Sequence, residues 1–178
     1  MITISIGFRA NAQKLFSCDK FSFSVVGPTG WQVLNHEDKK DAFNHSHSRQ
    51  NLITYYKNSN NIVGALNPTI SIFVVPNPFK DIDEFNKKMK RRRYEKYLTN
   101  YSLKEKPQLL TIGGKYGVFE TSTYLTNNEK EEPLNVKKRV YVFPSKKYLF
   151  YVNLVDERNN EENVLLFNSL VQSIKIPK

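Results

Sequence analysis

Two apolar runs near the C-terminal end of the chain place the tightest constraint on its fold. Residues 140–143 and 148–152 are rich in β-branched and aromatic side chains, and residues 144–147 between them have the composition of a turn. In a strand over the second run, Phe150 and Tyr151 point to opposite sides, and apolar residues continue on both. A sheet with one solvated face would alternate more cleanly. We therefore predict a β-hairpin whose two faces are both covered by other parts of the fold.

A helix is predicted to follow this hairpin and to supply part of the cover. Residues 156–163 are polar, with Asn159 or Asn160 suited to the N-cap, and glutamates follow where the helix dipole favours acidic groups. Apolar residues then recur at helical spacing, and burying each one is worth about 1.5–3 kcal/mol. Residues 173–176 are expected to form a short edge strand that Pro177 ends. The apolar stripe consists of Val164, Leu166, Phe167, Leu170, Val171 and Ile174.

Four further strands are predicted in the first half of the chain. Alternating or β-branched residues indicate strands over residues 20–26, 31–34, 52–56 and 69–75. Residues 35–51 between them are mostly polar and are expected to form a long surface loop.

One long helix is predicted over residues 82–97. Asp81 is a candidate N-cap, and Glu84 stands three residues later, as in a capping box. The predicted apolar stripe of this helix consists of Ile82, Phe85 and Met89.

The order of these elements predicts the fold class. Pro107 is expected to bound the region after the long helix, and residues 109–112 and 116–125 are predicted to pair through a turn at Gly113 and Gly114. The chain thus reads as strands, a helix, more antiparallel strands and a terminal helix. This pattern predicts an α+β fold in which helices pack on an antiparallel sheet.

Composition limits the classes of protein that the chain can belong to. Its 178 residues suit one domain, and a single cysteine, Cys18, excludes an internal disulfide framework and any zinc site that needs several cysteines. No apolar run reaches the length of about 18 residues that a transmembrane helix needs. The 27 Lys and Arg against 17 Asp and Glu give a net charge of +10. Such a charge attracts nucleic acid, a membrane surface or an acidic protein, or it simply keeps the protein soluble.

The first residues carry a partial export signal. An apolar stretch over residues 2–8 precedes Ala10-Asn11-Ala12, a small-x-small triplet of the kind found at signal-peptide cleavage sites. We therefore expect residues 1–17 to be an N-terminal segment that includes a signal-peptide remnant, and residues 18–178 to form a single domain. Export, to the periplasm in a bacterium, is the expected localisation, and a cytoplasmic location is the alternative.

Several short patterns of core and turn residues follow one another over residues 18–177. In this combination the chain resembles the PsbP-like family. The patterns are Phe21-x-Phe23 leading through Gly27-Pro28-x-Gly30 to Trp31, Pro68-x-Ile70-x-Ile72, Ile82-x-x-Phe85, Gly113-Gly114, and a tail that runs from Phe167 through Leu170 and Val171 to Ile176.

The resemblance implies an antiparallel sheet between helical layers, which is an α/β/α sandwich. The family includes photosystem accessory subunits, exported bacterial proteins and a nuclear-import cofactor, which are binding or assembly proteins rather than enzymes. It offers no site motif that can be transferred to residues of this chain, because a fold does not by itself specify a function.

One group of histidines is a candidate metal site. His45 and His47 can place two imidazoles on the same side of an extended segment, with His36, Asp38 and Asp41 nearby. Zinc and copper sites need three or four ligands held by fixed elements, whereas these residues lie in a polar predicted loop. Solvated loop histidines are therefore the simpler interpretation, and no cofactor is predicted.

A basic cluster on the predicted long helix is a candidate anion-binding or partner-binding site. Charge combined with neighbouring tyrosines is typical of single-strand binders, but consecutive helical positions point all around the axis. A solvated helix face therefore remains the alternative. The cluster consists of Lys87, Lys88, Lys90, Arg91, Arg92 and Arg93, beside Tyr94 and Tyr97.

No catalytic motif is present. The chain lacks a G-x-S-x-G elbow, a phosphate-binding P-loop, a G-x-G-x-x-G turn and an H-E-x-x-H helix. We predict a non-enzymatic binding or assembly factor with a protein partner. The alternative is a module that binds nucleic acid or an acidic protein through residues 87–93.

Overall fold

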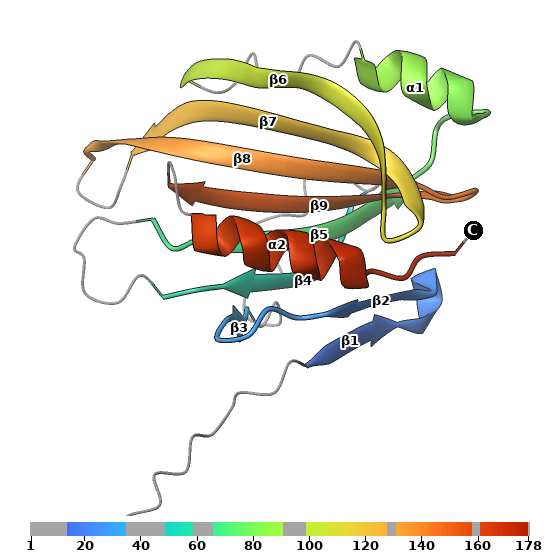
Figure 1. Ribbon diagram of the computed structural model, residues 1–178, viewed down its shortest axis with the longest axis horizontal. Coiled ribbons are helices and arrows are strands. Elements are labelled where there is room, and N and C mark those ends of the chain that lie inside the picture. The colour runs from blue at the N-terminus through green and yellow to red at the C-terminus, as the bar shows by residue number, and fades with distance from the viewer. Residues whose placement is uncertain are drawn as a thin grey trace, which may run out of the picture.

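The computed structural model describes residues 14–34, 49–58, 66–90, 99–127, 131–157 and 161–177. These residues form a seven-stranded, entirely antiparallel sheet in the order β3-β4-β5-β9-β8-β7-β6, together with a small sheet of β1 and β2 (Figure 1). The strands are β1 (Leu15–Cys18), β2 (Phe23–Val26), β3 (Gln32–Val33), β4 (Gln50–Tyr56), β5 (Thr69–Pro76), β6 (Thr99–Ile112), β7 (Lys115–Asn127), β8 (Pro133–Pro144) and β9 (Tyr148–Glu157), and the α-helices are α1 (Ile82–Lys90) and α2 (Glu161–Ser173).

Helices lie on opposite faces of the large sheet. On β9, Phe150 belongs to the core cluster that contains Phe167 of α2, whereas Leu149 belongs to the cluster that contains Phe85 of α1. Neighbouring residues of one strand thus serve two separate cores. This arrangement confirms the predicted α+β class and the α/β/α sandwich.

The α2 side of the sheet holds the larger core. Most of the predicted stripe is confirmed, since Phe167, Leu170, Val171 and Ile174 are buried and Val164 packs half-buried against them. The assignment of Leu166 to this stripe was wrong, because Leu166 is half-exposed and lines a cleft on the outer side of α2. The β1–β2 sheet extends this cover beside α2 (Figure 1). The edge strand predicted over residues 173–176 is reduced to a single bridge between Ser24 and Lys175. Neither described helix is long and apolar enough to cross a membrane.

The N-terminal capping box of α1 forms as predicted. Glu84 N–H donates to Asp81 Oδ1 at 2.8 Å, and Lys80 N–H donates to Glu84 Oε2 at 2.9 Å. Phe85 is buried, but Ile82 is 46% exposed, so its assignment to the buried stripe was wrong. Ile82 is the first residue of α1, and the contact of the helix with the core is made further along it by Phe85 and Met89. Met89 is also buried, and the remainder of the predicted 82–97 helix, beyond Lys90, lies outside the described residues.

The boundary predicted at Pro107 was also wrong, because β6 runs through it from Thr99 to Ile112. β6 is the last strand of the sheet, and an edge strand tolerates proline since an outward N–H is not needed for pairing. The register between β6 and β7 shifts between Glu105 and Gln108, around this proline.

The strand predicted over residues 20–26 is shorter in the structure, where β2 covers only Phe23–Val26. A 3-10 helix, Asp19–Phe21, precedes β2, and Ser22 between them has a φ of 47°. β1 begins at Leu15 and pairs with Val26 of β2, so ordered structure starts before residue 18.

Candidate functional site

The predicted histidine site and half of the predicted basic cluster cannot be placed. His36, His45 and His47 lie outside the described residues, as do the acidic residues beside them. Arg91, Arg92 and Arg93 are outside as well. Within the described ranges, no group of three or more His, Cys, Asp or Glu side chains could hold a metal ion.

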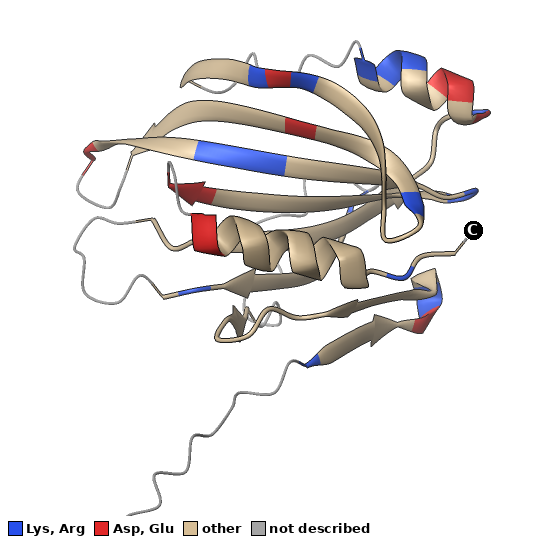
Figure 2. Ribbon diagram, viewed as in Figure 1, with Lys and Arg blue, Asp and Glu red and all other residues tan. Residues whose placement is uncertain are grey.

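The lysines of the predicted basic cluster lie at the C-terminal end of α1. Lys87, Lys88 and Lys90 are all exposed, and acidic residues occupy the first turn of the same helix. α1 packs beside β6, which exposes Lys104 and Lys106 (Figure 2). These five lysines therefore belong to neighbouring elements at one edge of the sheet.

A second surface is free of charge. Residues 21–34 and 163–173 contain no Asp, Glu, Lys or Arg, although 25% of the chain is charged. The two stretches form most of α2, β2 and β3, and Figure 2 shows α2 without charge beyond its first turn. We call the outer side of α2, β1 and β2 the charge-free face. It centres on Leu15, Val26, Pro28, Leu165, Leu166 and Ser169.

The charge-free face contains an open cleft between α2 and β2. The cleft has a volume of about 120 Å³. Leu15 pairs in register with Val26 on one side of it, and Leu165 lies one helical turn from Ser169 on the other. Leu15 and Leu165 are 69% and 70% exposed, more than any other large hydrophobic side chain described. The lining residues are Val26, Gly27, Pro28, Leu166, Ser169, Leu170 and Ser173.

A third surface is polar and lies on the same side of the sheet as α2. Figure 1 shows α2 in front of β9 and β5, whereas no described helix lies in front of β6, β7 and β8. The strand register shows which side chains point to this side. Tyr141 of β8 contacts Phe167 of α2, so every second residue of β8, and the residues paired with them on the neighbouring strands, point to the α2 side. We call this surface the β6–β8 face. It consists of Glu105, Phe119, Thr121, Thr123, Lys137 and Arg139.

Arg139 is the central residue of the β6–β8 face. It is only 9% exposed and lies opposite Thr121 on β7 and Leu154 on β9. Burial lowers the pKa of Arg139, while the charges of Asp156 and Glu105 act in the opposite direction. Neither carboxylate is close enough to form an ion pair with it by distance. The guanidinium therefore has no direct partner among the residues that the structure describes.

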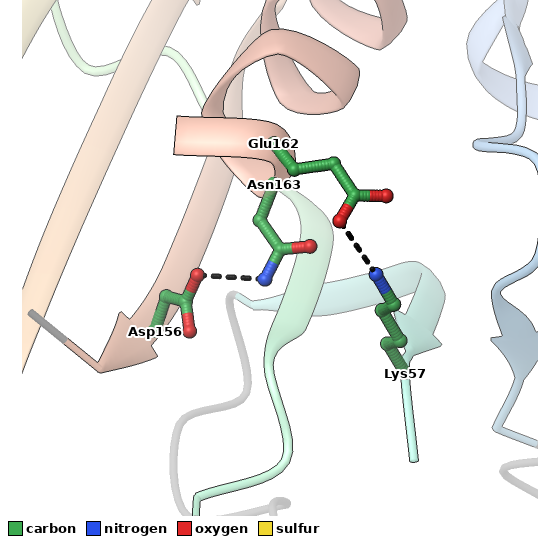
Figure 3. Close-up of polar contacts among 4 residues, drawn as sticks. All are labelled: Lys57, Asp156, Glu162 and Asn163. Carbon is green, nitrogen blue, oxygen red and sulfur yellow. Dashed lines mark hydrogen bonds and ion pairs between the residues drawn. The ribbon is translucent and has the colours of Figure 1, made fainter. Parts of the chain in front are cut away.

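Asp156 joins this surface to the start of α2. Its Oδ2 accepts a hydrogen bond from Asn163 Nδ2 at 2.8 Å (Figure 3). Its Oδ1 accepts one from Glu157 N–H at 2.7 Å. Burial raises the pKa of Asp156, and these hydrogen bonds oppose that shift. An exposed ion pair between Lys57 and Glu162, at 3.4 Å, ties β4 to the same helical turn. These contacts position the N-terminal end of α2 on the sheet.

Sequence reasoning missed both the charge-free face and Arg139. The first had a visible signal, because two uncharged stretches in a chain that is 25% charged are unusual. The second had none. In the run Lys137-Lys138-Arg139, neighbouring side chains point to opposite faces, and only the strand order decides which of them becomes buried.

No protein-family model matches the chain, and no curated protein matches it in sequence. The structure nevertheless shows the Mog1/PsbP-like fold, an α+β sandwich that recurs in solved structures similar to it. It is similar to cyanobacterial PsbP (CyanoP) from Synechocystis sp. PCC 6803, with a TM-score of 0.56 and 14% identity over 99% of this chain and 98% of that one.

Two further solved structures share the fold. The Ran-binding protein Mog1p of Saccharomyces cerevisiae has a TM-score of 0.53 and 9% identity over 94% of this chain and 96% of that one. LpqN of Mycobacterium tuberculosis, which is involved in cell envelope biogenesis, has a TM-score of 0.55 and 13% identity over 88% of this chain and 84% of that one. Identities this low establish the shared fold and leave the function to be argued from the surfaces.

Proposed function

We propose that this protein is a non-enzymatic binding or assembly factor that holds a protein partner on the charge-free face. The observation that carries the proposal is the pair of leucines, Leu15 and Leu165, that flank the cleft and are about 70% exposed. Exposed apolar residues gathered on one surface mark interaction sites more often than single scattered ones do.

The composition of the charge-free face supports a protein partner rather than an ionic ligand. The centres of protein interfaces are depleted in charged residues and surrounded by a polar rim. Here the rim includes Glu161 and Glu162 at the start of α2, Lys14 before β1 and Lys20 before β2. The cleft itself, at about 120 Å³, is large enough for one apolar side chain of a partner and small for a metabolite, since ligand pockets usually have volumes of about 300–1,000 Å³.

The proposal is tested by comparing captured proteins between matched variants. Affinity purification from the native host would use the wild type, Leu165→Glu, and Leu103→Glu as the control. Leu165 and Leu103 are both exposed, at 70% and 39%, so neither change should disturb the fold. We expect Leu165→Glu to lower partner affinity by more than about 10-fold, because an unpaired carboxylate would be desolvated in the interface.

Leu103 lies on β6, at the far edge of the sheet from the charge-free face, so the control should retain the partner. The proposal fails if both variants capture the same proteins as the wild type. It also fails if a purified partner binds Leu165→Glu with unchanged affinity in a calorimetric titration.

A second function is favoured by the lysines of α1 and β6. We propose as the alternative that this edge binds nucleic acid or an acidic protein, since two adjoining elements expose lysines there. Fluorescence anisotropy with a labelled single-stranded oligonucleotide and an oligoglutamate peptide would test it. Lys87→Glu/Lys88→Glu/Lys90→Glu should abolish a salt-dependent affinity, and Lys146→Glu/Lys147→Glu should preserve it. Absence of binding at low salt would exclude this function.

We also propose that the protein is exported, on the strength of the Ala10-Asn11-Ala12 triplet. N-terminal sequencing of the mature protein from its native host tests this directly. A start close after Ala12 supports export, and a start at Met1 contradicts it.

A further inference from the structure

Arg139 is a buried cation whose hydrogen-bonding capacity is unused. A guanidinium carries five N–H donors, yet this one makes no hydrogen bond or ion pair with any residue that the structure describes, at 9% exposure. Its nitrogen atoms are not among the described polar atoms that are sealed from solvent without a partner, so water or a ligand can accept these bonds. A ligand that replaced water here would meet donors that the strand pairing holds in place.

A second unused donor lies directly opposite. Thr121 pairs with Arg139 across β7 and β8, so both side chains point to the α2 side of the sheet. Thr121 is 2% exposed, and its hydroxyl likewise makes no hydrogen bond to a described residue. Neither the guanidinium of Arg139 nor the hydroxyl of Thr121 is among the described polar atoms that are sealed from solvent without a partner. Both residues therefore keep some contact with solvent on the β6–β8 face.

We propose that Arg139 and Thr121 form a binding site for a carboxylate group. The planar guanidinium fork matches the two oxygens of a carboxylate, and a cross-strand threonine hydroxyl can donate a further bond to one of them. Tyr141, two residues along β8, is already bonded to Asn168 of α2 and so closes that side of the site.

The shape of the donor set favours a carboxylate over a phosphate, because the planar guanidinium fork matches two coplanar oxygens. Asp156 and Glu105 both act electrostatically on Arg139. A phosphate monoester carries close to two negative charges at neutral pH, which doubles its repulsion from these carboxylates and its attraction to Arg139 alike, and it brings a third oxygen for which Arg139 and Thr121 offer no matching donor. Lys137, on the same face, pairs in register with Asp156 and offsets part of its charge.

The competing explanation is that Arg139 serves only to balance the buried charge of Asp156. Such a residue would show no saturable ligand binding, and a lysine at the same position would serve equally well. A carboxylate site depends instead on the planar fork and on the hydroxyl of Thr121. The two explanations therefore predict different outcomes for conservative variants.

The test is an NMR titration of protein labelled with ¹⁵N in arginine and in the backbone. Sodium acetate is added at constant ionic strength, with sodium chloride and inorganic phosphate as separate arms. We expect a saturable shift of the Arg139 Nε–H signal and of the Thr121 amide with acetate. We expect a weaker response to phosphate and none that saturates with chloride.

Three variants sharpen the result. Arg139→Lys should weaken acetate binding by at least about 10-fold, and Thr121→Val by about 2- to 10-fold, because one hydrogen bond is lost. Lys146→Met, on the exposed β8–β9 turn, should leave it unchanged. Leu165→Glu should also leave acetate binding unchanged. The carboxylate site and the partner site on the charge-free face are therefore tested independently. Shifts that do not saturate, that chloride reproduces, or that survive in Arg139→Lys would overturn the proposal.

Discussion

At the scale of single residues, Tyr55 shows what close packing imposes on polar atoms. Its ring packs against Gly27, where an added Cβ would lie only 2.8 Å from Cε1 of the ring, so this position requires glycine. The hydroxyl of Tyr55 is buried and has no partner among the described residues. Burial raises the pKa of this phenol to about 12. The ring of Tyr55 thus contributes packing, while its hydroxyl is buried without a hydrogen bond to a described residue.

Replacing Tyr55 with phenylalanine should therefore leave the free energy of unfolding unchanged or raise it by about 1 kcal/mol, because an unpaired hydroxyl is removed from the core. The pKa of Tyr55 is higher in the fold than its ordinary value of 10.0, so the folded state resists ionisation of this phenol. The wild type should therefore lose stability as the pH rises from 10.0 toward about 12, and the variant should lose less. Absorbance titration should show one tyrosine that ionises near that pH and disappears in the variant. Urea denaturation showing a loss well above 1 kcal/mol would reveal a partner for the hydroxyl.

At the scale of elements, the β6–β7 hairpin is docked on the end of α2. The last turn of α2 contains no basic residue of its own. Lys115 of β7 instead donates to the carbonyl oxygen of Gln172 at 3.3 Å and to that of Gly113 at 3.0 Å. A cation near these carbonyls also complements the helix dipole. Long-range contact thus completes a helix terminus that the local sequence leaves uncapped.

The two glycines of this hairpin provide a matched pair for testing the contact. Gly113 and Gly114 have φ angles of +55° and +74°, so alanine at either position costs about 1–2 kcal/mol of backbone strain. An added Cβ at Gly113 would also lie 2.6 Å from the Gln172 carbonyl oxygen, whereas at Gly114 it meets nothing within 4 Å. Gly113→Ala should therefore destabilise the protein by about 1–3 kcal/mol more than Gly114→Ala in urea denaturation. Equal losses would mean that the hairpin does not pack on α2 in solution.

At the scale of the whole molecule, an open sheet must protect its edges from pairing with other chains. β6 is one edge strand, and it combines shifts of register, Pro107 and the exposed Lys104 and Lys106. Proline and lysine are devices that natural edge strands use against such pairing. Pro107, which misled the prediction of this strand, therefore has a role in the assembled sheet.

Removing this protection should promote self-association. We expect Lys104→Thr/Lys106→Thr/Pro107→Val to associate at protein concentrations where the wild type does not, because a flat and uncharged strand edge can pair with a second copy. Sedimentation velocity over a concentration series would measure it. Lys146→Thr/Lys147→Thr lowers the net charge at the β8–β9 turn and serves as the control. Association of the control to the same extent would assign the effect to net charge rather than to the edge.

The sequence by itself determined the kinds of element and many of their ends. Strand and helix periods, the Asp81–Glu84 capping box and the Gly113–Gly114 turn depend on neighbours along the chain, which is why the fold class could be predicted. Only the tertiary structure decided that β6 continues through Pro107, that Ile82 stays exposed and that Arg139 is buried with no ion-pair partner among the described residues. The physical reason is that edge position, burial and charge pairing depend on strands that are distant in sequence. Local sequence patterns do not specify which of these strands becomes the neighbour.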